Sequence, residues 1–499
     1  MANSWVILGF GAYFVMLIGI AIVGARKMRD MSDYVLGGRR LSSFTAALSA
    51  GSSTTSAWTM LALPALAFTS GAVEVWVPAG AALGVWLSWT VLARRLRHYT
   101  IEAGNVLTIP EFYEVRFGDT TGALRVMTSA ITILFVVFYV SSGLVGGSKL
   151  LETIFGIEEN TGVVLTFIAV ASYTLIGGFM AVSRTDVSQA LLMLVSLLVI
   201  TFTLAGSAGS PLADLGGSTP GFFNPFTDSE GMAITITLLL SSAGWAFGAF
   251  GAHRILQRFM AVEHEESIPR SRNISIVWLV AVYGLAIMVG VLARPALAEA
   301  GMLAEVMDPE RIYIVVSEFF FHPVVTGVLL TGVIAAVMST ADSQLLLASA
   351  VATDDVPLVR RITYRVSAGA RIWIGRTLLV IIGLIAVAIS ILYPESIFEL
   401  VSYAWGGMGA AFGPVTILAL YWRRFNFWGA AASIVTGTAV ASAWAYLSGG
   451  PMGMWDIQPA TPGFLIATLV AVVVSYATPE PPSKVVELFD SVNADGVRG

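Results

Sequence analysis

The chain has 499 residues, of which 56% are hydrophobic and only 12% are charged, and its mean hydropathy is +0.81. Soluble proteins draw about a quarter of their residues from charged types, so this composition excludes a water-soluble fold. The 27 basic and 32 acidic residues give a net charge of −5, which excludes a basic nucleic-acid-binding protein. Because the chain contains no cysteine, disulfides and zinc–thiolate sites are excluded as well.

Apolar stretches of about 20 residues recur along the chain, and each is long enough to cross the hydrocarbon core of a bilayer. They are continuous rather than alternating with period two, which favours helices over a β-barrel. We therefore predict an all-α integral membrane protein with about thirteen transmembrane helices. The predicted spans are residues 4–24, 43–68, 73–92, 122–147, 161–182, 187–207, 232–253, 274–297, 324–349, 373–393, 399–421, 427–447 and 461–478.

The distribution of basic residues predicts the orientation of these spans. The first span lacks the basic start and cleavage site of a signal peptide and is followed by Arg26, Lys27 and Arg29, so we expect an uncleaved helix with its N-terminus outside. The regions then placed in the cytoplasm are loops 25–42, 93–121, 254–273, 350–372 and 422–426, a short turn at Arg184 and the C-terminal tail. With their adjoining helix ends they hold 24 of the 27 basic residues, as the positive-inside rule requires in a cell membrane.

Two regions are predicted outside the bilayer core. Residues 99–118 mix acidic and apolar positions, which suits either a short helix on the cytoplasmic interface or a packed loop. Residues 479–499 begin with a proline-rich stretch and continue with mixed charge, so we expect a soluble, partly disordered tail after a transmembrane domain of residues 1–478.

Polar interruptions in the apolar spans are informative because unsatisfied polar groups are costly in hydrocarbon. The second span contains the run Ser49–Trp58, with six hydroxyl side chains and a glycine near mid-membrane. Glycine and adjacent threonines weaken a helix, while hydroxyls can bond the freed backbone groups, so we expect an unwound point here. A continuous helix that packs through its small residues is the alternative.

A second interruption, Gly244–Arg254, lies five spans later. Broken helices at corresponding positions of two halves are typical of inverted-repeat transporters, whose binding site lies between them at the membrane midplane. The spacing therefore predicts one repeat over residues 43–207 and a second over residues 232–421.

The third interruption lies in the ninth span, where Ser339, Asp342 and Ser343 share one helical face with Thr340 beside them. A carboxylate here requires a cation, a proton or water, and hydroxyl and carbonyl oxygens suit an alkali cation, so we interpret this face as a cation pathway. A solvated Asp342 near the helix end is the alternative. Asp186 is expected to start the sixth helix, where it could simply complement the helix dipole.

No nucleotide-binding or hydrolase motif occurs in the sequence, and the four histidines lack metal-ligand spacing. We therefore expect no ATP, no nucleic acid and no organic cofactor, and a chain that is not an enzyme. An intramembrane enzyme is disfavoured, although Asp186 and Asp342 keep it open, and a passive channel would share the same signals. A sensor coupled to a kinase domain is disfavoured because residues 479–499 leave no room for one.

Six segments together resemble the sodium:solute symporter family, and within it the bacterial sodium/proline symporters. The segments are Asp33–Arg39, Ala46–Gly51, Leu107–Pro110, Gly177–Ser183, Ala335–Thr340 and Ser402–Trp405, and the likeness extends over residues 5–478. The resemblance implies a LeuT-type fold with a 5+5 inverted-repeat core and sodium-driven uptake of a small solute, with proline or another amino-acid-like solute as the first expectation. A small carboxylate or a betaine is the alternative substrate.

The resemblance also implies binding residues. For the coupling sodium they are the backbone carbonyls of Ser52, Thr55 and Ala336 and the hydroxyls of Ser339 and Thr340. For the solute they are Ser56, Ala57, Trp58, Trp245, Ala249 and His253. For a second cation they are Asp186, Asp342 and Ser343.

Four positions depart from the proline carriers, which place an aspartate at Thr54, a glycine at Ala57, a tyrosine at Ala249 and a proline at His253. We expect Asp342 to compensate for the missing carboxylate at Thr54. Ala249 enlarges one wall of the solute site and removes a hydroxyl donor, so the solute preference is expected to differ from that of a site tuned to proline.

Overall fold

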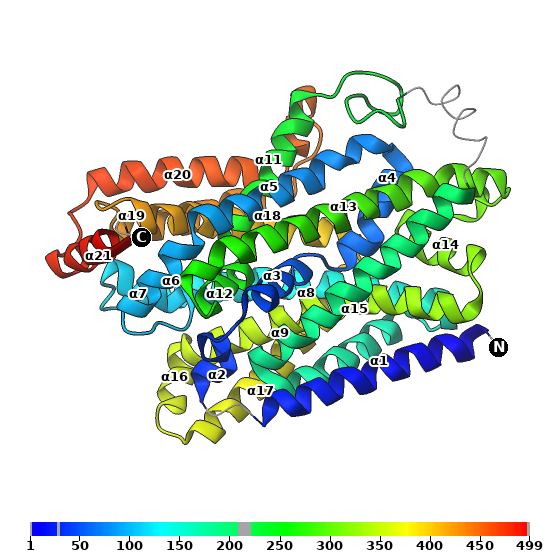
Figure 1. Cartoon of the computed structure of the whole chain (residues 1–499). Helices are drawn as coiled ribbons and strands as arrows, with labels where there is room; N and C mark the ends of the chain where they lie inside the picture. The colour runs from blue at the N-terminus through cyan, green and yellow to red at the C-terminus, as the bar shows by residue number, and fades with distance from the viewer. Residues whose placement is uncertain (1, 27–29, 208–220, 497–499) are drawn as a thin grey trace.

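The computed structural model describes residues 2–26, 30–207 and 221–496. Within these ranges the chain is a bundle of helices whose long axes run in roughly one direction (Figure 1), and no strand occurs among them. The predicted all-α architecture is therefore confirmed.

The long helices are α1 (Ala2–Ala25), α5 (Trp76–Val91), α8 (Ala123–Phe155), α9 (Glu159–Ser207), α11 (Ile236–Gly251), α13 (Ile268–Glu299), α15 (Pro323–Asp354), α17 (Ala368–Leu392), α18 (Ile397–Tyr421), α19 (Phe427–Trp444) and α20 (Ala460–Ala477). The shorter helices are α2 (Met31–Leu36), α3 (Ser43–Ser52), α4 (Leu63–Ser70), α6 (Ala93–Glu102), α7 (Ile109–Phe117), α12 (His253–Ala261), α14 (Ile312–Phe320), α16 (Pro357–Thr363) and α21 (Ser483–Gly496). Single turns join several of them: η1 (Gly37–Arg39), the π-helical η2 (Trp58–Ala62), η3 (Ala72–Val75), η4 (Glu265–Ser267), η5 (Leu303–Glu305), η6 (Pro309–Arg311) and η7 (Pro451–Asp456).

The outer surface of the bundle is apolar. Among the described residues, nine helices are long and apolar enough to cross a membrane. Their outward faces expose Val15, Phe202 and Val277, each with more than 70% of its surface accessible. Such side chains are stable only against lipid tails, so the chain is a multi-pass membrane protein.

Helix α9 combines two predicted spans. Its 49 residues would extend about 74 Å if straight, more than twice the thickness of the hydrocarbon core. The chain bends inside it at Gly178, where φ is 64° and ψ is −176°, a backbone conformation that essentially only glycine adopts. The predicted turn at Arg184 is therefore wrong, because Arg184 lies inside the second half of the helix.

The two regions predicted outside the bilayer are both helical. Residues 99–118 form the end of α6 and the whole of α7. The α7 side chains Phe112, Tyr113 and Arg116 are fully buried, so this segment packs into the bundle. The tail was expected to be partly disordered, yet α21 packs against α6 and α7. It does so through Val485, Phe489 and Val492, whose spacing places them on one helical face.

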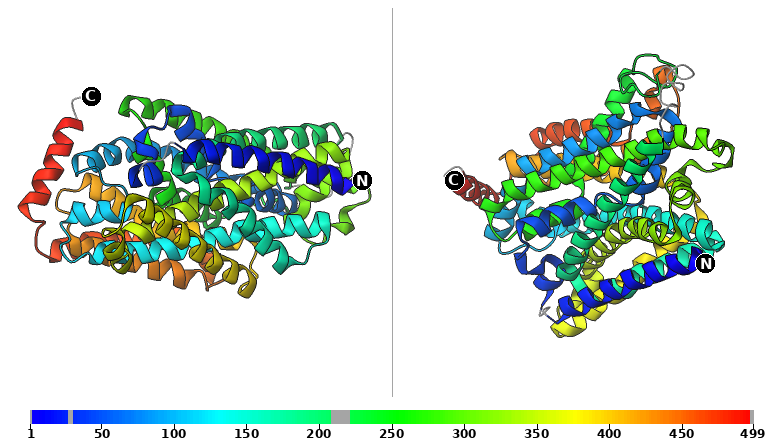
Figure 2. Two further views of the ribbon diagram at one scale, coloured as in Figure 1. Left: turned by 90° about the horizontal axis from the view of Figure 1, so that it is seen from below. Right: turned by 45° about the vertical axis from the view of Figure 1, so that its right-hand side comes forward.

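The two chain ends lie at opposite ends of the bundle (Figures 1 and 2). We call the end that carries α6, α7, α16 and α21 the C-terminal end, and the end where α1 begins the N-terminal end. This arrangement fits an odd number of crossings, and the count of thirteen stays a prediction. Lys27 and Arg29 of the predicted basic cluster lie outside the described residues.

Candidate functional site: two broken helices and a hydroxyl-lined partner

The helix that begins with α3 is interrupted after Ser52. Residues 53–57 separate α3 from the wide π-helical turn η2. Hydroxyls bond carbonyls beside the break: Thr54 Oγ1 donates to the Ala50 carbonyl at 2.7 Å, and Thr55 Oγ1 lies 3.3 Å from the carbonyl oxygens of Gly51 and Ser52. The predicted unwound point is therefore present, and the alternative of a continuous helix is wrong.

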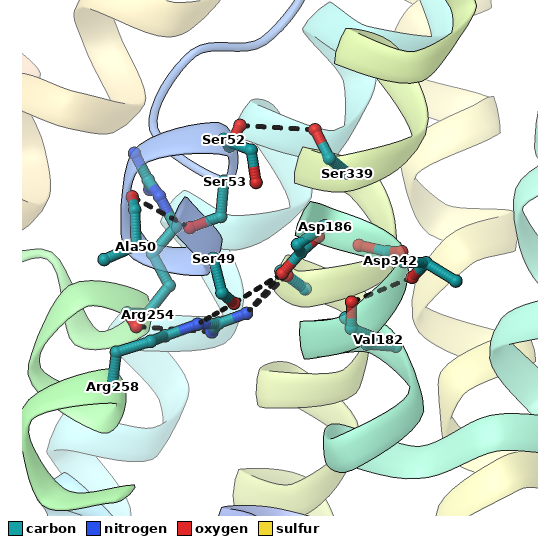
Figure 3. Close-up of polar contacts among 12 residues, drawn as sticks. Ser49, Ala50, Ser52, Ser53, Val182, Asp186, Arg254, Arg258, Ser339 and Asp342 are labelled. Carbon is teal, nitrogen blue, oxygen red and sulfur yellow. Dashed lines mark hydrogen bonds and ion pairs between the residues drawn. The ribbon is translucent and has the colours of Figure 1, made fainter. Parts of the chain in front are cut away.

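Oxygen atoms from α3 and α15 face each other at this break. Ser339 Oγ lies 3.2 Å from the Ser52 carbonyl oxygen and 3.1 Å from that of Ala336, and Figure 3 shows the first of these contacts. Thr340 Oγ1 lies 3.2 Å from the Ser53 carbonyl oxygen. Four of the five predicted sodium ligands, Ser52, Ala336, Ser339 and Thr340, therefore come together. For the fifth, Thr55, the described contacts stay within its own turn.

A buried ion pair lies beside this break, toward the C-terminal end of the bundle. Asp186 Oδ2 accepts a hydrogen bond from Ser49 Oγ at 2.5 Å and lies 3.4 Å from Arg258 Nη2 (Figure 3). Arg258 also donates to Ser343 Oγ at 2.6 Å and to Ser49 Oγ at 3.1 Å. All four side chains are inaccessible to solvent. Asp186 therefore has a specific partner deep in the bundle, and its explanation as a residue that merely complements a helix dipole is wrong.

Asp342 faces α9 rather than the break. Tyr173 Oη donates to Asp342 Oδ2 at 2.5 Å and lies 3.2 Å from the Met338 carbonyl oxygen. The other carboxylate oxygen of Asp342 is buried and has no hydrogen-bond partner among the described residues. A solvated Asp342 at the helix end is therefore excluded. Of the residues assigned to a second cation, the structure brings Asp186 and Ser343 together through Arg258 and turns Asp342 toward Tyr173.

The second break lies between α11 and α12 at Ala252, whose ψ of 93° is extended. It places Trp245 against the first break, because the ring of Trp245 stacks on that of Trp58 with 5.1 Å between centroids. The ring of Tyr283 also packs against Trp58, with 5.4 Å between the two ring centroids. Trp405 Nε1 donates to the Trp245 carbonyl at 2.9 Å. The two predicted aromatic residues of the solute site thus meet at the crossing of the two broken helices.

The other predicted solute residues are buried but less closely grouped. Ser56 Oγ accepts a weak hydrogen bond from the Trp58 amide at 3.4 Å, and Ala57 and Ala249 are fully buried. His253 instead faces α8 and α18: its Nδ1 lies 2.9 Å from Thr132 Oγ1, and its ring packs on Phe412 at 4.3 Å.

Sequence reasoning missed the two arginines of α12. Arg254 and Arg258 were assigned to the cytoplasmic loop 254–273, yet both are fully buried inside the bundle. Their position immediately after a predicted helix break was the available signal, since a break at mid-membrane leaves the following residues inside the bilayer. Tyr139 and Tyr173, whose contacts complete the site, carried no distinguishing signal, and Trp405 carried only its place in the segment Ser402–Trp405 of the family resemblance.

Known proline transporters are similar to this chain over most of its length. The chain is 36% identical to the high-affinity proline transporter PutP of Bacillus subtilis over 93% of this chain and 96% of that protein. It is 34% identical to the sodium/proline symporter of Escherichia coli, with 97% and 95% of the two chains covered.

Solved structures of the same fold are also known. The structure of a substrate-bound, outward-open Na+-coupled sialic acid symporter matches with a TM-score of 0.79 at 18% identity, covering 97% of this chain and 99% of that one. Mhp1, a nucleobase-cation-symport-1 family transporter, matches with a TM-score of 0.56 at 12% identity, covering 92% and 98%. These matches confirm the predicted LeuT-type fold. The family model described as "Sodium:solute symporter family" matches residues 34–437, and the chain belongs to this family.

Proposed function

We propose that this protein is a sodium-coupled symporter that imports proline or another small amino-acid-like solute across the cell membrane. The observation that carries the proposal is the meeting of the Ser52 and Ser53 carbonyls with the Ser339 and Thr340 hydroxyls at a broken helix. These hard oxygens suit a dehydrated Na+, which would replace the hydroxyl protons as the partner of the carbonyls.

Coupling follows from the shared position of the two sites. Thr54 and Ser53 belong to the same five-residue break that turns Trp58 toward Trp245, and Trp58 Nε1 donates to the Thr54 carbonyl at 3.0 Å. A sodium ion that orders the break therefore also orders the solute site, and by linkage each ligand raises the affinity for the other by the same factor. One Na+ that moves inward through 100 mV releases about 2.3 kcal/mol for solute accumulation.

The remaining predictions belong to this proposal. The N-terminus lies outside and residues 479–499 lie in the cytoplasm, with repeats over residues 43–207 and 232–421. The transporter works without ATP, an organic cofactor or nucleic acid and performs no enzymatic reaction. The family resemblance also predicts a second cation at Asp186, Asp342 and Ser343, but the positive charge of Arg258 beside Asp186 and Ser343 argues against it.

Uptake of radiolabelled L-proline into proteoliposomes that contain the purified protein tests the proposal. An inward Na+ gradient should drive saturable accumulation, and an equal K+ gradient should not. Unlabelled small amino acids, betaines and carboxylates added as competitors then define the preferred solute. If no solute of these classes accumulates with sodium, the proposal is wrong. Uptake at the same rate with and without a sodium gradient would instead indicate a channel.

A further inference from the structure

Arg254 is a fully buried cation with no counter-charge. All three of its guanidinium nitrogens are buried and have no hydrogen-bond acceptor in the described part of the chain. None of the ion pairs in that part includes it, whereas the next arginine of α12, Arg258, has Asp186. In Figure 3 the side chain of Arg258 extends toward Asp186, and that of Arg254 points away from it.

Aromatic rings surround this arginine. Its guanidinium carbon lies 4.3 Å from the ring centroid of Tyr139 and 5.1 Å from that of Trp405. Cation–π contacts stabilise the charge, but a ring face does not replace the in-plane acceptors that the five N–H groups of a guanidinium require. The buried donors therefore remain available to a ligand.

The same rings connect Arg254 to the solute site. Trp405 donates to the backbone of Trp245, which stacks on Trp58. Tyr139 Oη lies 3.4 Å from the Thr54 carbonyl oxygen at the first break. The Tyr283 hydroxyl, whose ring contacts Trp58, is a further buried group without a hydrogen-bond partner among the described residues. Arg254 therefore lies in the wall of the predicted solute site, at the crossing of the two broken helices.

We propose that Arg254 binds the carboxylate group of the transported solute. This inference rests on the proposed function and identifies which part of the solute is recognised. A buried guanidinium is stable only with a partner, and its planar fork matches the two oxygens of a carboxylate. The position of Arg254 at the start of α12 adds the positive end of the helix dipole.

The site recognises the carboxylate rather than the amine. Two carboxylates buried in the described core are already engaged, Asp186 by Arg258 and Asp342 by Tyr173, and position 54 carries a threonine. An ammonium group therefore meets ring faces, hydroxyls and backbone carbonyls such as that of Thr54, but no free carboxylate among the described residues. The surrounding tryptophans suit an organic anion with an apolar body and disfavour a hydrated inorganic anion.

Three compounds with the same five-membered ring size separate these contributions: L-proline carries both groups, cyclopentanecarboxylate only the carboxylate and pyrrolidine only the amine. Binding to the purified full-length protein in sodium is measured by thermal shift and by tryptophan fluorescence, with acetate, chloride and inorganic phosphate as further probes. We expect L-proline and cyclopentanecarboxylate to bind and pyrrolidine, chloride and phosphate not to bind.

Substitutions of Arg254 test whether this side chain is responsible for carboxylate binding. Arg254→Gln should weaken carboxylate binding at least tenfold, and Arg254→Lys, which keeps the charge but loses the fork, should weaken it less. Both variants should keep the thermal shift that sodium alone produces, since no hydrogen bond or ion pair among the described residues joins Arg254 to a predicted sodium ligand. Arg423→Gln, at an exposed ion pair with Asp490, is the matched control and should bind like wild type.

Three results would overturn the inference: an Arg254→Gln protein with wild-type affinity, equal binding of pyrrolidine, or equal binding of chloride or phosphate. Failure of all the carboxylates on the wild-type protein would overturn it as well. In that case sodium-driven uptake of a different solute would still support the proposed function, so the two failures are distinguishable.

Discussion

At the scale of single residues, the hydroxyl of Thr340 gives the most direct test of the sodium site. Its Oγ1 lies 3.2 Å from the Ser53 carbonyl oxygen and 3.5 Å from that of Ser52. Thr340→Ala removes one oxygen ligand, which at about 1.5 kcal/mol should raise the half-saturating sodium concentration for uptake roughly tenfold. Sodium titration of solute uptake measures this change.

Ser433→Ala is the matched control for that substitution. Ser433 is equally buried, and its hydroxyl donates to the Ala467 carbonyl between α19 and α20, away from both broken helices. It should leave the half-saturating sodium concentration unchanged. If Thr340→Ala also left it unchanged while the protein stayed folded, sodium would have to bind elsewhere.

Arg258 bears on the number of sodium ions. Its guanidinium already places one positive charge between Asp186 and Ser343, two of the residues that the family resemblance assigns to a second cation. Because a second cation would have to displace or approach this charge, we expect one sodium per solute and a Hill coefficient near one for sodium-dependent uptake. A coefficient near two would show that sodium binds beside Arg258 and would support the assignment from the resemblance.

Sequence reasoning at single positions depended on residue chemistry. Ser339 and Thr340 were noticeable because hydroxyls on and beside one face of a buried helix are uncommon in a membrane unless they serve a polar pathway, and their role as sodium ligands stays a prediction. The partner of Asp342, by contrast, is Tyr173 on another helix, and no local pattern indicates which face of α9 a tyrosine occupies. Arg254 and Arg258 were misplaced because a positive charge after an apolar span normally marks a cytoplasmic loop.

At the scale of helices, Gly178 determines how α9 turns back through the bundle. Its φ of 64° and ψ of −176° are strained for any residue with a Cβ atom. Gly178→Ala should therefore lower the free energy of unfolding by about 1–3 kcal/mol, which thermal melting of the purified protein detects. Gly11→Ala in α1 is the control, because its φ is helical and a Cβ atom there meets no other atom within 4 Å. Equal melting temperatures for the two variants would contradict a strained turn at Gly178.

Helix breaks were easier to predict than helix turns. The breaks after Ser52 and near Ala252 coincide with runs of small, hydroxyl and glycine residues, whose local cost to a helix is visible in sequence. The turn in α9 was displaced because the polar run at Arg184 resembles a loop, whereas the residue that turns is a glycine inside an apolar stretch. Helix α21 was missed because its apolar face is short and needs α6 and α7 to become stable.

At the scale of the whole molecule, a cluster of charges joins four helices at the C-terminal end of the bundle. Arg125 of α8 donates to Asp355, which follows α15, with 2.5 Å between Nε and Oδ1, and it also pairs with Glu114 of α7. Thr108 Oγ1 donates to the same Asp355 oxygen at 3.1 Å, and Arg371 of α17 pairs with Asp354. A movement that opened this end of the bundle would expose Asp355 to water, so we expect this cluster of charges to stabilise the closed form.

The protonation of Asp355 should therefore make the closure of this end depend on pH. Burial raises the pKa of Asp355 to about 7, although Arg125 opposes the shift. The packed form thus holds the proton more tightly than an open form in which the pKa returns toward 3.8. The stabilisation that protonation provides is present below about pH 4 and is lost as the pH rises through 7.

The melting temperature of the purified wild-type protein should accordingly fall between pH 5 and pH 8, and Asp355→Asn should flatten this dependence. Asp490→Asn is the control: Asp490 is exposed, and its hydrogen bond with Arg423 lowers its pKa, so it stays ionised over this range. Equal pH dependence in Asp355→Asn and wild type would show that the dependence comes from another group.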